Sequence, residues 1–328
     1  MRAVMTATLA AATFMMLPAM VRAQPSDVRS RCFARDGVAS DQKLMACTAV
    51  IESGRETPQG LVAAFNSRGN VYLNIQNYDR AIDDYNEAIR RDPNYVSGFN
   101  NRGLAYLRKG DNDRAIQDFG EGIRLDPRYA IGFNNRGLAY QRKGENDRAI
   151  QDFDEAIRLD PRYALALVNR ANSHRTRGRF DAAIKDSGEA ISLNPGLAAA
   201  FFARAAAYQD KAQWDFDAYL NDGAYEDRAI ADYDEAIRLD PNNAAAFRNR
   251  GTVNSKRQRY DRAIADFTEA IRLDPNMAAA FYGRAFALRF VGQYERAIAD
   301  YRKALTLKLD NATRTQIERT LRQLGAAG

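Results

Sequence analysis

The chain has 328 residues, of which 46% are hydrophobic and 27% are charged, and its formal net charge is +6. This composition is typical of a soluble folded protein. Acidic and basic residues alternate along the sequence, as in RAIADYDEAIR, instead of forming blocks. Such alternation indicates a solvated surface and argues against a nucleic-acid partner.

The amino terminus, residues 1–23, differs from the rest of the chain. Arg2 precedes an apolar run that extends to Met20, and the segment ends in Val21-Arg22-Ala23. This pattern predicts a secretory signal peptide cleaved after Ala23. The alternative is a retained anchor helix, but the apolar run is short for a membrane span and contains a proline. We therefore expect an exported protein, in the periplasm, with no stable membrane insertion after cleavage.

Residues 24–61 contain both cysteines, Cys32 and Cys47. In an exported protein, a disulfide is the default state of such a pair. Closing a loop of this size contributes about 3 kcal/mol in the chain-entropy model. Residues 41–53 are predicted to form a helix, so this region is expected to be a disulfide-stapled helical cap. A redox role is the alternative, although a CxxC motif is absent.

From residue 62 the sequence repeats with a period of 34 residues. An Asp-Pro or Asn-Pro step marks the period at Pro93, Pro127, Pro161, Pro195, Pro241 and Pro275, with one longer interval of 46 residues. Residues 98–130 and 132–164 differ at four aligned positions. A fixed period of this length is typical of a solenoid.

Each repeat is predicted to be a helical hairpin. With the proline as position 32, the repeats begin at residues 62, 96, 130, 164, 198, 244 and 278. An apolar residue at position 4, a small one at 8 and frequently Tyr at 11 share one helix face. Glycine at position 15 in four repeats permits the left-handed conformation that ends a helix, and the proline ends the second helix.

This pattern resembles the tetratricopeptide repeat family. The resemblance rests on the residues above together with Ala at position 20, an aromatic residue at 24 and Ala at 27, and it covers residues 62–309 in seven repeats. It implies an all-α, right-handed α-solenoid. Two departures are Leu309 in place of the last proline and Ser187 in place of an aromatic residue. Residues 310–328 are predicted to form a capping helix over the last apolar edge.

Position 7 is Arg and position 23 is Asp in every repeat. Both lie eight residues from position 15, so antiparallel helices would place them at the same height. We predict that they pair within each hairpin, rather than Asp pairing with Arg at position 19 or both remaining solubilising surface charges. In the first four repeats the predicted structural pairs are Arg68 with Asp84, Arg102 with Asp118, Arg136 with Asp152, and Arg170 with Asp186.

Positions 2, 5, 6, 9 and 12 of the first helices line a concave groove, as the family resemblance implies. In repeats one to four they are rich in amides, which can satisfy the backbone of an extended peptide: Asn66, Asn70, Asn100, Asn101, Asn134, Asn135, Asn169 and Asn172. In repeats five to seven they change to types enriched at binding hot spots, and the predicted groove residues are Phe202, Arg248, Asn249, Tyr282 and Phe286. A solvated face without a fixed ligand is the alternative.

Repeat five contains twelve extra residues between its helices, within residues 210–222. This insert holds Trp214, the only tryptophan of the chain, and is expected to be either neutral or a contact surface. Its carboxylates lack the glycine and the terminal glutamate of a calcium-binding loop.

No catalytic residue, metal site or cofactor is predicted. The single histidine, His174, stands where other repeats have tyrosine, so it is expected in the core. The sequence offers no His-based catalytic set, no His/Cys cluster and no phosphate-binding glycine loop. An envelope enzyme is therefore the least favoured class.

These observations predict a non-enzymatic scaffold that binds a peptide or protein segment in the groove, in the cell envelope. The alternative is a structural assembly subunit of an envelope secretion or polysaccharide-export complex, which contacts its partners through the repeat edges and the 210–222 insert. A carboxylate clamp for chaperone tails, found in some tetratricopeptide proteins, is not expected, since Asn66, Ile131 and Asn135 occupy positions that need cations. The sequence does not predict the partner's identity or the oligomeric state.

Overall fold

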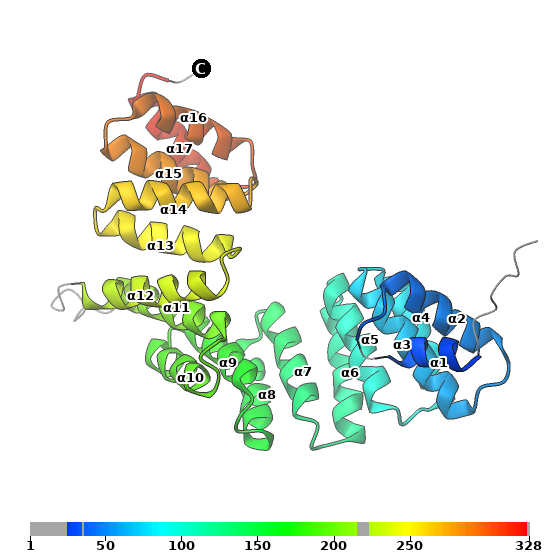
Figure 1. Ribbon diagram of the computed structural model, residues 1–328. Coiled ribbons are helices and arrows are strands. Elements are labelled where there is room, and N and C mark those ends of the chain that lie inside the picture. Colours follow the sequence, from blue (N-terminus) through cyan, green and yellow to red (C-terminus); the bar gives the residue numbers. More distant parts are fainter. Residues whose placement is uncertain (1–24, 35, 215–222, 327–328) are drawn as a thin grey trace, which may run out of the picture. The chain divides into compact units, whose positions relative to one another are not determined.

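The computed structural model describes residues 25–34, 36–214 and 223–326 (Figure 1). The predicted signal peptide, residues 1–23, and residues 215–222 of the insert lie outside these ranges. Within them every regular element is an α-helix. None of these helices has the length and hydropathy required to cross a membrane.

The chain divides into two compact parts after Pro93. The first part contains α1 (Pro25–Phe33), α2 (Ser40–Glu52), α3 (Pro58–Asn74) and α4 (Tyr78–Arg91). The predicted disulfide between Cys32 and Cys47 joins α1 to α2, and both side chains are fully buried. The cysteines pack with Val50 of α2 and Ala64 of α3, so the stapled helices cover the first hairpin.

The second part, residues 94–328, continues with six more hairpins and a final helix within the described residues. Its helices are α5 (Val96–Lys109), α6 (Asn112–Leu125), α7 (Ala130–Arg142), α8 (Asn146–Leu159), α9 (Ala164–Thr176), α10 (Phe180–Leu193), α11 (Ala198–Trp214), α12 (Ala224–Leu239), α13 (Ala244–Lys256), α14 (Tyr260–Leu273), α15 (Ala278–Phe290), α16 (Tyr294–Leu305) and α17 (Asn311–Gln323). In this part each helix packs on the next, and the first helices of neighbouring repeats also contact one another. This is the helix packing of an α-solenoid.

The turns follow from the residues at positions 15 and 31. Except in repeat five, where α11 continues through Ala212, position 15 has a positive φ, for example 90° at Gly110 and 79° at Gly144. At the other end of the repeat, Oδ1 of Asp126 accepts a hydrogen bond from the backbone N–H of Arg128 at 2.9 Å. Asp160 makes the same bond to Arg162 at 3.0 Å. The aspartate of the Asp-Pro step thus holds the turn that the proline begins.

In six of the seven hairpins the small residue at position 8 packs against an aromatic residue at position 24, while repeat four has the buried Ser187 there. A Cβ added to Gly103 would lie 2.7 Å from Cε1 of Phe119, and one added to Gly137 would lie 2.6 Å from Cε1 of Phe153. Both phenylalanines are almost completely buried. The glycines are therefore required because the ring of the second helix rests on the backbone of the first.

The carboxyl-terminal hairpin is covered by α17. Ile317 and Leu321 of this helix are buried in one cluster with Leu288 and Tyr301. The polar remainder of α17 faces outward, which is the arrangement expected of a solenoid cap. In repeat five, α11 has 17 residues and α12 has 16, against 13 and 14 in repeat six. α11 therefore extends into the insert, whereas α12 begins at Ala224, just after it.

Candidate functional site

An Arg–Asp ion pair links the two helices of every hairpin. In repeat three, Nη2 of Arg136 lies 2.7 Å from Oδ1 of Asp152, and Nε donates to Oδ2 at 2.9 Å. The same pair forms elsewhere at 2.6–2.8 Å, between Arg68 and Asp84, Arg102 and Asp118, Arg170 and Asp186, Arg204 and Asp232, Arg250 and Asp266, and Arg284 and Asp300. The aspartates are buried, so the pairs lie inside the hairpins and have a structural role.

In the pair of Arg102 and Asp118, burial and hydrogen bonding shift the pKa of the aspartate in opposite directions. Burial raises the pKa of Asp118, while the hydrogen bonds from Arg102 lower it. The same hydrogen bonds raise the pKa of Arg102. The pKa of Asp118 is raised overall, since burial outweighs the hydrogen bonds from Arg102 that favour the carboxylate.

The arginines also reach toward the preceding repeat. Nη1 of Arg170 lies 2.7 Å from Oδ1 of Asp154, and Nη1 of Arg250 lies 2.6 Å from Oδ1 of Asp234. Both partners occupy position 25 of the preceding repeat. Where this position is Gly120, there is no side chain to accept the bond, and a Cβ added there would lie 3.8 Å from Nη1 of Arg136.

Five of the predicted groove asparagines form a continuous hydrogen-bonded chain, which we call the asparagine ladder. Asn169 donates to Asn134 at 2.9 Å, Asn134 donates to Asn135 at 3.2 Å, and Asn135 donates to Asn100 at 2.9 Å. Asn100 then donates to Asn101 at 3.2 Å. Asn100, Asn134 and Asn135 are 4–7% exposed. The ladder therefore connects the first helices α5, α7 and α9, and its central amides satisfy one another.

The remaining predicted amides are more varied. Asn66 and Asn70 lie on α3, and Oδ1 of Asn70 accepts a hydrogen bond from the Tyr85 hydroxyl at 2.7 Å. Asn172 is partly exposed on α9. Asn249, on α13, is buried, and the nearby Tyr233 hydroxyl donates a hydrogen bond to Oε1 of Gln209 at 2.8 Å.

In repeats six and seven the first helices enclose a pocket of about 540 Å³. Arg248 of α13 and Tyr282 and Phe286 of α15, all predicted groove residues, line it. Thr252 and Ser255 of α13 complete one wall. We call it the α13–α15 pocket. Phe202 lies outside its lining, in an edge-to-face contact with Tyr233 at 5.8 Å between ring centroids.

Arg248 differs from the seven paired arginines. Within the described residues its guanidinium has no ion pair and no hydrogen bond, and it is partly buried. Burial lowers the pKa of Arg248 from its ordinary value, because the charged form loses water without gaining a carboxylate. The Ser255 hydroxyl oxygen in the same wall is also buried without a hydrogen-bond partner in the part of the chain that the structure describes.

Aromatic rings continue beyond the α13–α15 pocket. Tyr260, which also lines it, stacks on Phe290 with ring centroids 4.9 Å apart, and Phe286 lies 4.8 Å from Phe290. The guanidinium of Arg289 lies 5.3 Å from the centroid of Phe290 and 5.7 Å from that of Phe286. Phe290 is 51% exposed. Repeat seven thus presents both aromatic surface and positive charge.

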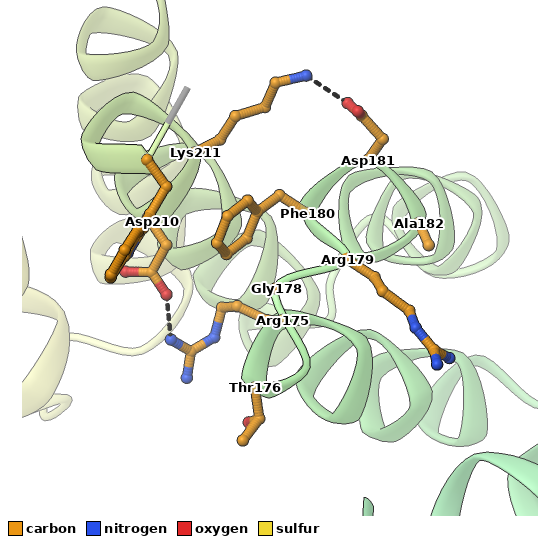
Figure 2. Close-up of a pocket in the computed structure, with 10 residues that line it drawn as sticks. Arg175, Thr176, Gly178, Arg179, Phe180, Asp181, Ala182, Asp210 and Lys211 are labelled. Carbon is orange, nitrogen blue, oxygen red and sulfur yellow. Dashed lines mark hydrogen bonds and ion pairs between the residues drawn. The ribbon is translucent and has the colours of Figure 1, made fainter. Parts of the chain in front are cut away.

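A second pocket, of about 1050 Å³, lies between the α9–α10 turn and the end of α11 (Figure 2). Here the charges are matched within the chain. Arg175 pairs with Asp210 at 2.6 Å, and Lys211 pairs with Asp181 at 2.5 Å, as the dashed lines in Figure 2 show. This pocket consequently offers less to a charged ligand than its size indicates.

The geometry does not assemble a catalytic centre around His174. Nδ1 of His174 is buried with no hydrogen-bond partner among the described residues, and Nε2 is 3.9 Å from Oδ2 of Asp186. Burial lowers the pKa of His174 despite the attraction of Asp186. In the described ranges no group of His, Cys, Asp and Glu could hold a metal ion.

Sequence reasoning placed Arg248, Tyr282 and Phe286 on this face but missed the pocket that they form. Sequence reasoning overlooked Gly283. A Cβ at this position would lie 2.4 Å from Cζ of Phe267. The ring of Phe267 therefore reaches the pocket through the space that glycine leaves. A signal was present, since position 6 of repeat seven is glycine where earlier repeats have larger residues.

Two family models for tetratricopeptide repeats match the sequence. One, described as TPR repeat, matches residues 69–110 and 106–144. The other, described as tetratricopeptide repeat, matches residues 134–198, 216–278 and 255–312. Together they cover well over half of the chain. No curated protein sequence matches it.

Solved structures with the same helix packing include a tetratricopeptide repeat protein from Parabacteroides merdae, at 16% identity and a TM-score of 0.59, covering 81% of this chain and 99% of that one. The APC/C hetero-tetramer Cut9–Hcn1 gives 17% identity and a TM-score of 0.67, covering 90% and 53%. A human IFIT1 dimer with m7Gppp-AAAA gives 16% identity and a TM-score of 0.62, covering 87% and 68%. At these identities the likeness shows the fold alone.

Proposed function

This chain belongs to the tetratricopeptide repeat family, and we propose that it is a non-enzymatic scaffold that holds a segment of a partner protein against its first helices. We call the surface formed by positions 2, 5, 6, 9 and 12 of these helices the first-helix face. The protein-interaction role is general to this family. The choice of this face, and of an extended or helical peptide segment as the ligand, is our proposal.

The observation that carries the proposal is the α13–α15 pocket, which opens among residues at the predicted binding positions. Arg248 is at position 5 of repeat six, and Tyr282 and Phe286 are at positions 5 and 9 of repeat seven. Ile131 and Leu165, at position 2 of repeats three and four, are 46% and 48% exposed. Exposed apolar side chains and aromatic pockets on one face are typical of an interaction surface.

We propose that the protein acts in the cell envelope, in the periplasm. Residues 1–23 have the pattern of a cleaved signal peptide. The Cys32–Cys47 disulfide supports an oxidising compartment, because such bonds persist mainly outside the cytosol. Intact-mass measurement of the protein from an envelope fraction should give a chain that begins at Gln24; a chain that retains residues 1–23 would contradict cleavage.

The domain boundaries proposed from the sequence are a cap over 24–61, repeats over 62–309 and a capping helix within 310–328. α2 ends at Glu52 and α17 begins at Asn311, whereas α3 begins at Pro58, inside the proposed cap, and continues into the first repeat.

A second candidate function is a structural assembly subunit that contacts its complex through the repeat edges and the insert. The elongated α11 and the 75% exposed Trp214 at its end favour this alternative. Replacement of residues 215–222 by a Gly-Ser linker of the same length should abolish partner binding under this alternative and preserve it under the first.

Site-specific photo-crosslinking tests the proposed face. A photoreactive residue at Leu165 or Thr252, both on the first-helix face, should crosslink one partner protein in envelope extract. Gln151 on α8 and Ala265 on α14 are exposed positions of second helices and serve as matched controls. Equal crosslinking from all four positions would contradict a ligand on the first-helix face.

A further inference from the structure

We propose that the α13–α15 pocket selects an acidic segment with aromatic side chains, in which a carboxylate of the partner pairs with Arg248 and a neighbouring ring enters the pocket. The inference rests on the proposed function, since it specifies the chemistry of the segment that the first-helix face binds. It concerns repeats six and seven alone, so the ligand class can be tested separately from the face.

The first step is the charge on Arg248. The seven arginines at position 7 each have a buried aspartate at 2.6–2.8 Å, whereas Arg248, also partly buried, has no carboxylate within the described residues. A guanidinium that loses water without a partner destabilises the folded chain. A ligand carboxylate would remove this penalty and form a bidentate, charge-assisted pair.

The second step is the absence of an acid in the lining. None of the described side chains that line the α13–α15 pocket is Asp or Glu. Lys256 lines one side, but its ammonium lies 3.0 Å from Oε1 of Glu226. Arg289 lies over the rings of Phe286 and Phe290. Arg248 in the lining and Arg289 beside it therefore place positive charge next to the aromatic surface, and a carboxylate of a ligand is the complementary group.

The third step is the apolar part of the pocket. Tyr282, Phe286 and Phe267 supply rings to the lining, and the ring of Phe267 occupies the space that Gly283 leaves. A volume of about 540 Å³ is sufficient for one or two large side chains. A ring in this space would make offset or edge-to-face contacts with the lining rings. A segment with acidic residues alone would pair with Arg248 but would leave the ring-lined part of the pocket empty.

The test measures the binding of matched peptides to the chain of residues 24–328 by fluorescence anisotropy. The probe is fluorescein-labelled Gly-Ser-Glu-Phe-Asp-Glu-Tyr-Gly-Ser. Its amide counterpart, Gly-Ser-Gln-Phe-Asn-Gln-Tyr-Gly-Ser, has nearly the same shape and no acidic side chains. A third peptide replaces Phe and Tyr of the probe by Ala. We expect the probe to bind about tenfold more tightly than either counterpart, as one charge-assisted hydrogen bond predicts.

Arg248→Met retains the length of the side chain and removes its charge. It should make the acidic and amide peptides bind equally, whereas a merely structural change would weaken both and preserve their ratio. Arg262→Met, on the exposed surface of α14, is the matched control and should preserve the preference. The thermal midpoint of Arg248→Met without peptide should equal or exceed that of the wild type. Arg248→Lys should retain part of the preference.

The proposal is overturned if the amide peptide binds as well as the acidic one, if Arg248→Met retains the preference, or if the probe shows no binding at about 1 mM. Crosslinking from Leu165 and Thr252 tests the proposed face separately from the proposed ligand chemistry. If these positions still capture a partner while the peptide preference is absent, the proposed face stands and the ligand chemistry is wrong. If neither result is obtained, both proposals fail.

Discussion

Repeats two to four and repeats six and seven use the same face of their first helices in opposite ways. In α5, α7 and α9 the asparagine ladder joins neighbouring helices, and its central amides are buried and hydrogen-bonded to one another. In α13 and α15 the corresponding positions enclose a pocket, and Arg248 there has no carboxylate partner among the described residues. The comparison teaches that the same repeat positions join neighbouring helices in one region and, in another, line a pocket with a cation that is unpaired in the part of the chain that the structure describes. This is the difference on which the proposed recognition rests.

The two regions differ in whether their partly or fully buried polar groups have a partner within the described residues. A buried amide that donates to and accepts from its neighbours contributes to stability, and it has less capacity left for a ligand. A partly buried cation without a carboxylate destabilises the free protein and gains most from a ligand. Stability measurements on matched variants can therefore separate the cohesive residues from those that recognise a ligand.

The largest effect is expected at a paired arginine. Arg136→Met leaves Asp152 buried without its partner, and it should lower the free energy of unfolding by about 3–5 kcal/mol. Adding Asp152→Leu should restore much of this loss, because both charges are then removed. Urea denaturation followed by circular dichroism measures both variants, with Arg248→Met as the unpaired comparison. Additive losses from the two substitutions would show that the pair is a solvated surface feature.

The next effect concerns the ladder. Asn135→Ala leaves the buried Oδ1 of Asn100 and the amide of Asn134 without their partner, so it should cost about 1–3 kcal/mol of stability. Its affinity for the acidic aromatic peptide should equal that of the wild type. Asn172→Ala, at a partly exposed amide of α9, should change stability by less than about 0.5 kcal/mol. A weaker peptide affinity in Asn135→Ala, at unchanged stability, would reverse the assignment of the two regions.

A smaller, pH-dependent effect is expected at His174, which follows the ladder on α9. Burial lowers its pKa below the ordinary value of 6.5, so near pH 6 the unfolded chain binds a proton that the folded chain does not. This contribution to stability is complete above pH 6.5 and is lost as the pH falls from 6.5 through the lowered pKa of the folded state. Thermal midpoints at pH 8 and about pH 5.5 should therefore differ more for the wild type than for His174→Tyr. Equal differences would place His174 in contact with solvent.

The smallest effect tests the connection between repeats. Gly120→Asp places a carboxylate where Asp154 and Asp234 stand in other repeats, within reach of Arg136. It should stabilise the chain by about 0.5 kcal/mol relative to Gly120→Asn, which has a similar helix propensity. The difference should shrink at high salt. Equal stabilities of the two variants would mean that position 25 does not couple neighbouring repeats.

Much of the architecture was predictable because it depends on local periodicity. The 34-residue period predicted the hairpins, glycine at position 15 predicted the left-handed turns, and the Asp-Pro step predicted the end of each second helix. The cysteine content predicted the disulfide that joins α1 to α2. Each of these features involves residues that are close in sequence or repeated at a fixed spacing.

The candidate site was predicted less completely. Periodicity identified the face that carries Asn100, Asn135, Arg248 and Tyr282, but it treated all of them as available to a ligand. The structure shows Asn135 donating to Asn100 of the neighbouring repeat and Arg248 without a carboxylate among the described residues. Such partners come from other helices, and a pattern within one repeat does not reveal them.

The sequence by itself determined the helix pattern, the turns and the face that each side chain occupies, because backbone propensity and the 3.6-residue helix period act within a single repeat. Only the tertiary structure decided which polar groups satisfy one another and where a pocket opens. Hydrogen-bond geometry and burial depend on distances between helices. Gly283 illustrates the distinction, since its position follows from the repeat, while the ring of Phe267 that fills its space comes from α14, in the preceding repeat.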